Sequence, residues 1–310
     1  MALFFVYLHF NLNSPEQEIP LTPILKRTQQ GLIAMRKLHH DTKMLKFISL
    51  GSGSSGNCYF LFTNSDGIII DCGIGLRAMK KFFVEYGMHT SSIKRILVTH
   101  DHADHVKSVG SLSIDKNLPV YTTEEVHMGI TRNWCVRKKI EQHNRMNLIK
   151  DVTIELGDFR ITPFDVPHDS TDNVGYKIEH DGVVFVLVTD CGTITEEIGR
   201  YISEANYLVI EANHDPEMLS KGPYPKYLKN RIVSCKGHLC NEDSAMAVIK
   251  YATPKLRHVW LCHLSEENNH PELARKTYEN VLRNHGIIAG ADFKLDVLKR
   301  KTPTGVFELE

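Results

Sequence analysis

The heptapeptide Thr99–His105, THDHADH, constrains this chain more than any other stretch. It packs three histidines and two aspartates directly behind the apolar run 95–98, RILV. That run predicts a buried strand, so the heptapeptide is a loop at a strand end, where a rigid scaffold commonly presents functional groups. Histidines two residues apart cannot share a helix face, but in an extended turn they can converge on one ion. Because the four good donors of the motif cannot all face one centre, we expect two metal ions.

Such a metal centre needs further ligands, and three candidates lie elsewhere in the chain. His168, Asp190 and His263 each follow an apolar run that predicts a strand. The fold must therefore bring several strand ends together at one edge. Asp71 follows the run 67–70 in the same way, and we expect it to orient the loop or a ligand histidine rather than to bind an ion itself.

The pattern along the chain predicts a mixed sheet system with helices outside. Many of the short apolar runs come in consecutive pairs, which excludes a strict strand-helix-strand repeat. The predicted helices are about 75–86, 105–114, 241–251 and 271–284, where Asn241 caps the third and Pro271 lies in the first turn of the fourth. The predicted strands are 46–50, 58–63, 67–71, 95–99, 152–156, 159–164, 174–179, 183–189, 205–211 and 258–262.

Residues 1–43 differ in character from the rest of the chain. They contain three prolines and show no sustained hydrophobic period, whereas the first predicted strand begins just after Met44. We expect residues 1–43 to be either a flexible N-terminal extension or an upstream stretch that a mis-called start has added. Residues 44–310 are then the catalytic domain.

Charge and cysteine content limit the class of protein. The 37 basic and 37 acidic residues cancel, so any nucleic-acid binding must come from a local patch. Seven cysteines without a CxxC pair make a poor disulfide framework, which favours the reducing cytoplasm. No run approaches the ~20 apolar residues of a membrane helix, and we expect no membrane partner.

The stretch 51–56, GSGSSG, matches the GxGxxG pattern of dinucleotide-binding proteins directly after a strand. That pattern binds a pyrophosphate only where its third glycine opens a helix. Here the aromatic-rich run 58–63 comes next, which predicts another strand. We therefore expect a tight turn between two strands and not a cofactor site.

With these motifs in place, the chain resembles the metallo-β-lactamase superfamily. The resemblance implies an α/β fold, a single-domain four-layer αββα sandwich, with two divalent ions, zinc or manganese, along the edge of its two sheets. An aspartate at 190, where some lactamases use cysteine, suits hydrolysis of phosphoesters better than hydrolysis of antibiotics. The implied ligands are His100, His102 and His168 for one ion, Asp104, His105 and His263 for the other, and Asp190 between the two ions.

A dinuclear site of this kind implies hydrolysis by a metal-bridged hydroxide, with Asp104 assisting and no protein nucleophile. Glu211 ends an apolar run and His238 precedes a helix, and together they resemble the glutamate-histidine pair of the tRNA 3′-processing nucleases. The resemblance implies a pair that protonates the leaving oxygen of a phosphodiester. The alternative is a surface acid and an unrelated histidine at a helix entry.

The stretch 221–238 contains five basic residues and two tyrosines but no acid. This composition suits a phosphate backbone and unstacked bases, and we select Lys226, Lys229 and Arg231 as substrate contacts. A solvated helix face is the alternative.

The layout of three motifs, FISLGSGSSGNCYF, GHLCNED and CHLSEENN, resembles the YycJ/WalJ group of that superfamily. The resemblance implies a DNA exonuclease, with Ser54, Ser55 and Asn57 near its substrate unless they form only a structural turn. Two alternatives stay open. One is a small-molecule hydrolase of the same fold, acting on a thioester, a lactone or a cyclic phosphodiester, and the other is a non-catalytic nucleic-acid-binding metalloprotein.

Overall fold

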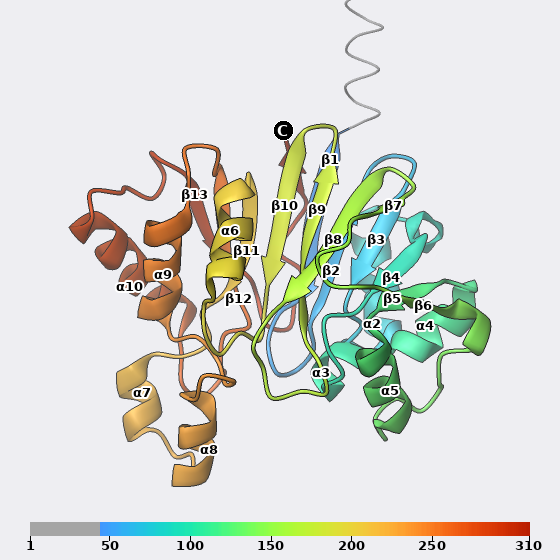
Figure 1. Cartoon of the computed structure of the whole chain (residues 1–310), viewed down its shortest axis with the longest axis horizontal. Coiled ribbons are helices and arrows are strands. Elements are labelled where there is room, and N and C mark those ends of the chain that lie inside the picture. Colours follow the sequence, from blue (N-terminus) through green and yellow to red (C-terminus); the bar gives the residue numbers. More distant parts are fainter. Residues whose placement is uncertain (1–43) are drawn as a thin grey trace, which may run out of the picture. The chain divides into compact units, whose positions relative to one another are not determined.

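The computed structural model describes residues 44–310, and both expectations for residues 1–43 lie outside that range (Figure 1). The strands of the described part form two mixed sheets of seven strands each. The first sheet has the order β14 (Phe307–Leu309), β1 (Leu45–Gly51), β2 (Cys58–Phe62), β3 (Gly67–Ile70), β4 (Arg95–Leu97), β5 (Val120–Thr122) and β6 (Arg145–Asn147). The second has the order β13 (Lys294–Val297), β12 (His258–Cys262), β11 (Tyr207–Glu211), β10 (Val183–Val188), β9 (Val174–His180), β8 (Phe159–Asp165) and β7 (Ile154–Leu156).

Each sheet has an antiparallel half and a parallel half. In the first sheet, β3, β4, β5 and β6 are parallel neighbours. In the second, β10, β11, β12 and β13 are parallel neighbours. The carboxyl ends of parallel strands meet at one edge of their sheet, and this is the edge that can gather side chains from several strand ends.

Helices cover the outer face of each sheet (Figure 1). Those beside the first sheet are α2 (Leu76–Glu85), α3 (Ala103–Val106), α4 (Val109–Lys116) and α5 (Glu124–Arg132). Those in the second half of the chain are α6 (Glu196–Glu204), α7 (Pro216–Lys221), α8 (Lys226–Ile232), α9 (Asn241–Tyr251) and α10 (Pro271–Asn284).

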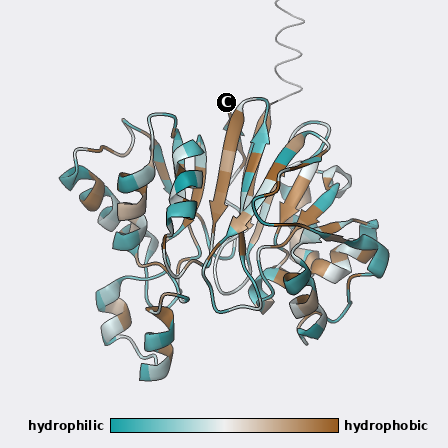
Figure 2. Ribbon diagram, viewed as in Figure 1, coloured by the Kyte–Doolittle hydropathy of each residue, from teal (hydrophilic) through white to brown (hydrophobic). Residues whose placement is uncertain are grey.

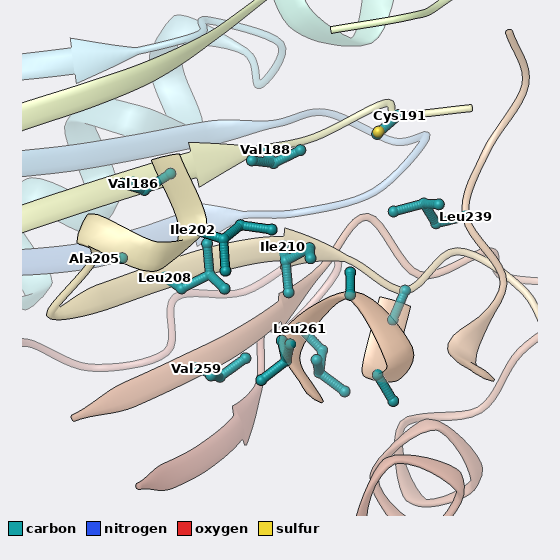
Figure 3. Packing of buried hydrophobic residues seen from close by; sticks show 14 of the residues in the cluster. Val186, Val188, Cys191, Ile202, Ala205, Leu208, Ile210, Leu239, Val259 and Leu261 are labelled. Atoms are coloured by element: carbon teal, nitrogen blue, oxygen red, sulfur yellow. The ribbon is translucent and has the colours of Figure 1, made fainter. Parts of the chain in front are cut away.

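The strand β10 shows how the layers are held together. Its apolar residues alternate between two buried clusters, because successive side chains of a strand point to opposite faces. Phe185 and Leu187 join the cluster between the two sheets, whereas Val186 and Val188 join the cluster under α6, α9 and α10. Figure 3 shows part of that second cluster, with Val186 and Val188 near Ile202 of α6.

A third cluster packs α2, α4 and α5 on the outer face of the first sheet. Three apolar interfaces separate four layers, and the strands are accordingly apolar along most of their length while the helices are polar on their outer sides (Figure 2). The predicted four-layer αββα sandwich is confirmed.

The predicted elements differ from the structure in two respects. The single helix expected over 105–114 is two helices, α3 and α4, because the amide of Ser108 between them donates to the carbonyl of Cys72. The short strands β5, β6, β13 and β14 and the short helices α7 and α8 were not predicted, since elements of this length carry little hydrophobic period. The helices α5 and α6 were also missed, although each has one apolar face and begins at a threonine that caps it. Among residues 44–310, no helix is both long and apolar enough to cross a membrane. The cytoplasmic location stays a prediction.

Candidate metal centre and its surroundings

The candidate metal centre lies where strands of both sheets end. The strands β10, β11 and β12 are neighbours in register, so the residues that end or follow them, Asp190, Glu211 and His263, come side by side. Three residues that end or follow strands at this edge have left-handed backbone: Asp71 (φ 60°), Asp190 (φ 50°) and His263 (φ 53°). Such a conformation is uncommon for residues other than glycine and clusters at functional sites, where the surrounding structure enforces it.

The first candidate ligand group consists of His100, His102 and His168, whose ligand nitrogens all lie within 4.8 Å of one another. Nδ1 of His168 donates to the carbonyl of Gly237 (3.0 Å), which leaves the lone pair of Nε2 for the group, 3.3 Å from Nδ1 of His102. Nε2 of His100 is buried and has no hydrogen-bond partner among the described residues. A buried acceptor without a donor, next to two further imidazoles, is what a cation would satisfy.

The second candidate group consists of Asp104, His105 and His263. Asp190 lies between the groups: its Oδ2 is 3.1 Å from Nε2 of His105, and its Oδ1 is 3.8 Å from Nε2 of His168. The structure thus brings together all seven ligands that the sequence predicted, and their binding of metal stays a prediction.

The charges of this cluster favour cations. Burial would raise the pKa of Asp190, but His263 and His105 outweigh it and hold that pKa well below its usual value. Burial would lower the pKa of His263, but Asp190, Asp104 and Glu211 raise it to about 10. The carboxylates therefore attract positive charge to the cluster. Oxygen and imidazole donors around that charge fit divalent ions, and a metal-binding centre agrees with the observed donors.

Asp71 takes the orienting role that the sequence predicted. Its Oδ2 accepts a hydrogen bond from Nδ1 of His105 (2.7 Å), so Nε2 of that ring faces the cluster. The amide and the hydroxyl of Thr99 donate to the same carboxylate, both at 2.9 Å. A ligand histidine held in this way has a fixed ring orientation and tautomer.

The GSGSSG stretch is the predicted turn between β1 and β2, which pair as antiparallel neighbours. Asn57, just after this turn, is fully buried. The nitrogen of its side-chain amide, Nδ2, lies 2.8 Å from Nε2 of His105. The structure therefore places Asn57 inside the protein, against the nitrogen of His105 that faces the cluster, and not at a surface that a substrate could reach. Ser54 and Ser55, by contrast, are exposed at the tip of the turn.

The backbone of Gly73 packs against this turn and against the loop Thr99–His105, which we call the metal loop. A methyl group on Gly73 would lie 1.6 Å from the carbonyl oxygen of Asp104. We expect Gly73→Ala to cost roughly 3 kcal/mol of unfolding free energy, because a backbone carbonyl cannot move aside without displacing Asp104. Urea denaturation and metal content measure the effect. Gly75→Ala is the control, since a methyl group there meets nothing within 4 Å, and equal stability of both variants would contradict the prediction.

Glu211 and His238 form the predicted pair, and Glu211 also contacts the metal cluster. Oε1 of Glu211 accepts from Nδ1 of His238 and from Nδ1 of His263, both at 2.8 Å. Its Oε2 accepts from the amides of Cys191 (2.9 Å) and Leu239 (3.1 Å). Burial would raise the pKa of this carboxyl, but His238 and the other donors lower it to about 2. Because Glu211 is fully buried, it positions two histidines and does not itself reach a substrate.

Asp101, the second aspartate of the heptapeptide, joins two loops. Its carboxylate accepts hydrogen bonds from the amide (3.1 Å) and the hydroxyl (2.6 Å) of Thr171, in the loop that carries His168. The carboxylate packs against Gly129 of α5, where a methyl group would lie 2.1 Å from it. Asp101 therefore has a structural role, which sequence spacing could not reveal.

Two cavities of about 570 and 580 Å³ adjoin Asp104. Arg231 lines the first, and Ser54 and Ser55 line the second. Lys226 and Lys229 lie on α8 and line neither, and Nζ of Lys229 donates to the carbonyl of Ser220 (2.7 Å).

Both cavities are also lined by Trp134, which sequence reasoning did not select. A lone tryptophan between basic residues, in the stretch TRNWCVRKK, was the available signal.

Comparison with known proteins identifies the family of this chain. The sequence model described as the beta-lactamase superfamily domain matches residues 67–263. Two curated relatives are similar over nearly their whole length. Exodeoxyribonuclease YycJ from Bacillus anthracis is 34% identical over 262 residues, which cover 84% of this chain and 98% of that protein. Exodeoxyribonuclease WalJ from Streptococcus pneumoniae is 33% identical over 264 residues, which cover 85% of this chain and 98% of that protein.

Solved structures agree on the fold. The metallo-β-lactamase fold protein YhfI from Bacillus subtilis has a TM-score of 0.62 at 16% identity and covers 86% of this chain and 99% of its own. Zn²⁺-bound PqqB from Methylobacterium extorquens has a TM-score of 0.63 at 15% identity and covers 83% of this chain and 99% of its own. At these identities the likeness concerns the fold alone.

Proposed function

Because this chain belongs to the metallo-β-lactamase superfamily and is a metal-dependent hydrolase, we propose that its substrate is DNA, which it degrades from a strand end. The observation that carries the proposal is that Glu211 accepts hydrogen bonds from two histidines, His238 and His263, beside the seven candidate ligands. A single buried carboxylate holds His238, the proton donor, and His263, a ligand, each through a 2.8 Å hydrogen bond. The two relatives named exodeoxyribonucleases support DNA as the polymer.

His100, His102 and His168 would hold one divalent ion, and Asp104, His105 and His263 the other, with Asp190 shared. When bound, two such ions supply Lewis acidity that activates water and stabilises negative charge on the phosphoryl oxygens. We propose zinc or manganese, which both accept imidazole and carboxylate ligands.

The chain's own contribution is to hold a proton near the leaving oxygen. Nδ1 of His238 donates to Glu211, which leaves Nε2 as the nitrogen that can deliver a proton. Burial would lower the pKa of His238, but the carboxylate of Glu211 outweighs burial and raises that pKa, so the ring holds its proton more tightly than a free histidine does. A phosphodiester releases a poor alkoxide leaving group, and a positioned acid of this kind accelerates that step.

The proposal predicts that the full chain with Mn²⁺ or Zn²⁺ shortens linear DNA, labelled at either end, and leaves circular single-stranded DNA intact. The two forms should differ because an exonuclease needs a strand end, and a circle has none. Gel analysis of both forms, beside an RNA of the same sequence, measures it. If DNA stays intact while a thioester, a lactone or a cyclic phosphodiester is hydrolysed, the substrate assignment is wrong.

A further inference from the structure

Trp134 is the most exposed large apolar side chain among residues 44–310, with 86% of its surface accessible. It lies two residues beyond the end of α5, and Figure 1 shows α5 at the same end of the sandwich as the short helix α3 of the metal loop. Burying an indole is worth more than burying almost any other side chain, so an indole left in water at a functional edge calls for a ligand with an apolar face.

The turn that carries Trp134 is fixed to the metal loop through Asn133. The side-chain amide of Asn133 donates to the carbonyl of Asp101 (2.7 Å), and its side-chain oxygen accepts from the amide of Cys135 (2.8 Å). Nζ of Lys139 donates to the carbonyl of the same asparagine (2.7 Å). Hydrogen bonds on both sides of Trp134 hold its backbone beside the metal loop, so the indole extends from a fixed point next to that loop.

Trp134 and Asp104 line both cavities at the metal centre, so the indole stands between them. Arg132 lines the first cavity, and Lys107 and Arg137 line the second. None of these three cations has a carboxylate partner within 4.0 Å in the part of the chain from residue 44 onward. Arg231, in the first cavity, is paired with Asp169 (3.0 Å). Free positive charge on both sides of an exposed indole matches a strand that carries phosphates on both sides of a base.

We propose that Trp134 is a stacking platform for one unpaired nucleobase next to the scissile phosphate, and that Arg132 and Arg137 receive the flanking phosphates. Only an unstacked base offers the ring its face, so the base that reaches Trp134 is unpaired, at a single-stranded end or at a duplex end whose terminal pair has opened. This inference rests on the proposed function, because it names the form of DNA that the centre accepts. A protein partner does not fit as well, since its apolar surface would have to cover the arginines around the indole.

The first test measures binding without turnover. The chain has two tryptophans, and Trp260 is fully buried, so a short single-stranded oligonucleotide added in EDTA should quench the emission of Trp134 alone. Trp134→Phe should remove the quenched component. Trp134→Ala should weaken oligonucleotide binding, measured by fluorescence anisotropy, roughly fivefold to a hundredfold, the range that removal of one stacking aromatic produces. Val84→Ala, which trims a comparably exposed side chain on α2, should change neither signal.

The second test separates the base from the phosphate. Trp134→Ala should raise KM for single-stranded DNA and leave kcat nearly unchanged, because the indole contacts the base and not the scissile phosphate. Trp134→Phe should restore most of the affinity because the aromatic face remains. An oligonucleotide with an abasic site near its end should bind the wild-type chain and Trp134→Ala equally well.

The outcomes distinguish the two proposals. If DNA is degraded and neither quenching nor a change in KM occurs, the stacking inference is overturned and the exonuclease proposal stands. If the oligonucleotide quenches Trp134 but no nucleic acid is cleaved with either metal, the proposed function fails and stacking is supported.

Discussion

Asp190→Asn is expected to lower hydrolysis at least about a thousandfold and to remove most of the bound metal. This aspartate lies between the two ligand groups and is the negative charge that both share. Asparagine keeps its size but not its charge, so the surrounding histidines lose the anion that draws cations to them. Loss of metal forfeits several kcal/mol of transition-state stabilisation, and ~4 kcal/mol corresponds to that thousandfold loss.

Metal content by mass spectrometry and hydrolysis of bis(p-nitrophenyl) phosphate check this prediction, since neither depends on DNA binding. Asp101→Asn is the matched control, because this aspartate contacts Thr171 and belongs to none of the ligand groups. It should keep its metal and most of its activity. An Asp190→Asn protein with two ions and wild-type turnover would refute the shared-ligand assignment.

His238→Ala is expected to lower the rate on DNA by roughly a hundredfold to a thousandfold, the usual contribution of a positioned general acid. The same variant should lose little on bis(p-nitrophenyl) phosphate, because nitrophenolate leaves without a proton. His238 is not one of the seven predicted ligands, although its ring lies with Asp190, Glu211 and His263 in a further group of donor atoms. The metal content of the variant should therefore stay near two. Steady-state rates on both substrates, with metal analysis, provide the measurement.

Glu211→Gln removes the negative charge from both contacts of the buried carboxylate, with His238 and with His263. This variant should lower the hydrolysis rates of both DNA and bis(p-nitrophenyl) phosphate and weaken metal binding, because His263 and His238 both lose their anionic partner. Imidazole in the buffer should restore part of the DNA cleavage of His238→Ala and none of that of Glu211→Gln. An equal loss on both substrates by His238→Ala would show that this histidine is not the proton donor.

Much of the site could be predicted from the sequence because its ligands are local signals. HxHxDH is continuous, and His168, Asp190 and His263 each come after an apolar run. A strand end is readable from hydrophobicity, and a polar residue just beyond it is conspicuous. The same reasoning could not place Asn57, which is buried against Nε2 of His105, because burial of a turn depends on the segments that pack against it.

What the sequence by itself determined is the type of centre: the donors and the apolar strands that carry them, in a mixed sheet system with helices outside. The four-layer sandwich was implied by the resemblance to the metallo-β-lactamase superfamily. The order of strands was decided only by the tertiary structure. Because β11 lies between β10 and β12, Glu211 sits next to both Asp190 and His263 and can hold a ligand and a proton donor at once. Packing of distant segments likewise set Gly73 against Asp104, and it placed Trp134 between two cavities. These relations depend on strand register and on contacts between residues far apart in the chain, and no local pattern of residues encodes them.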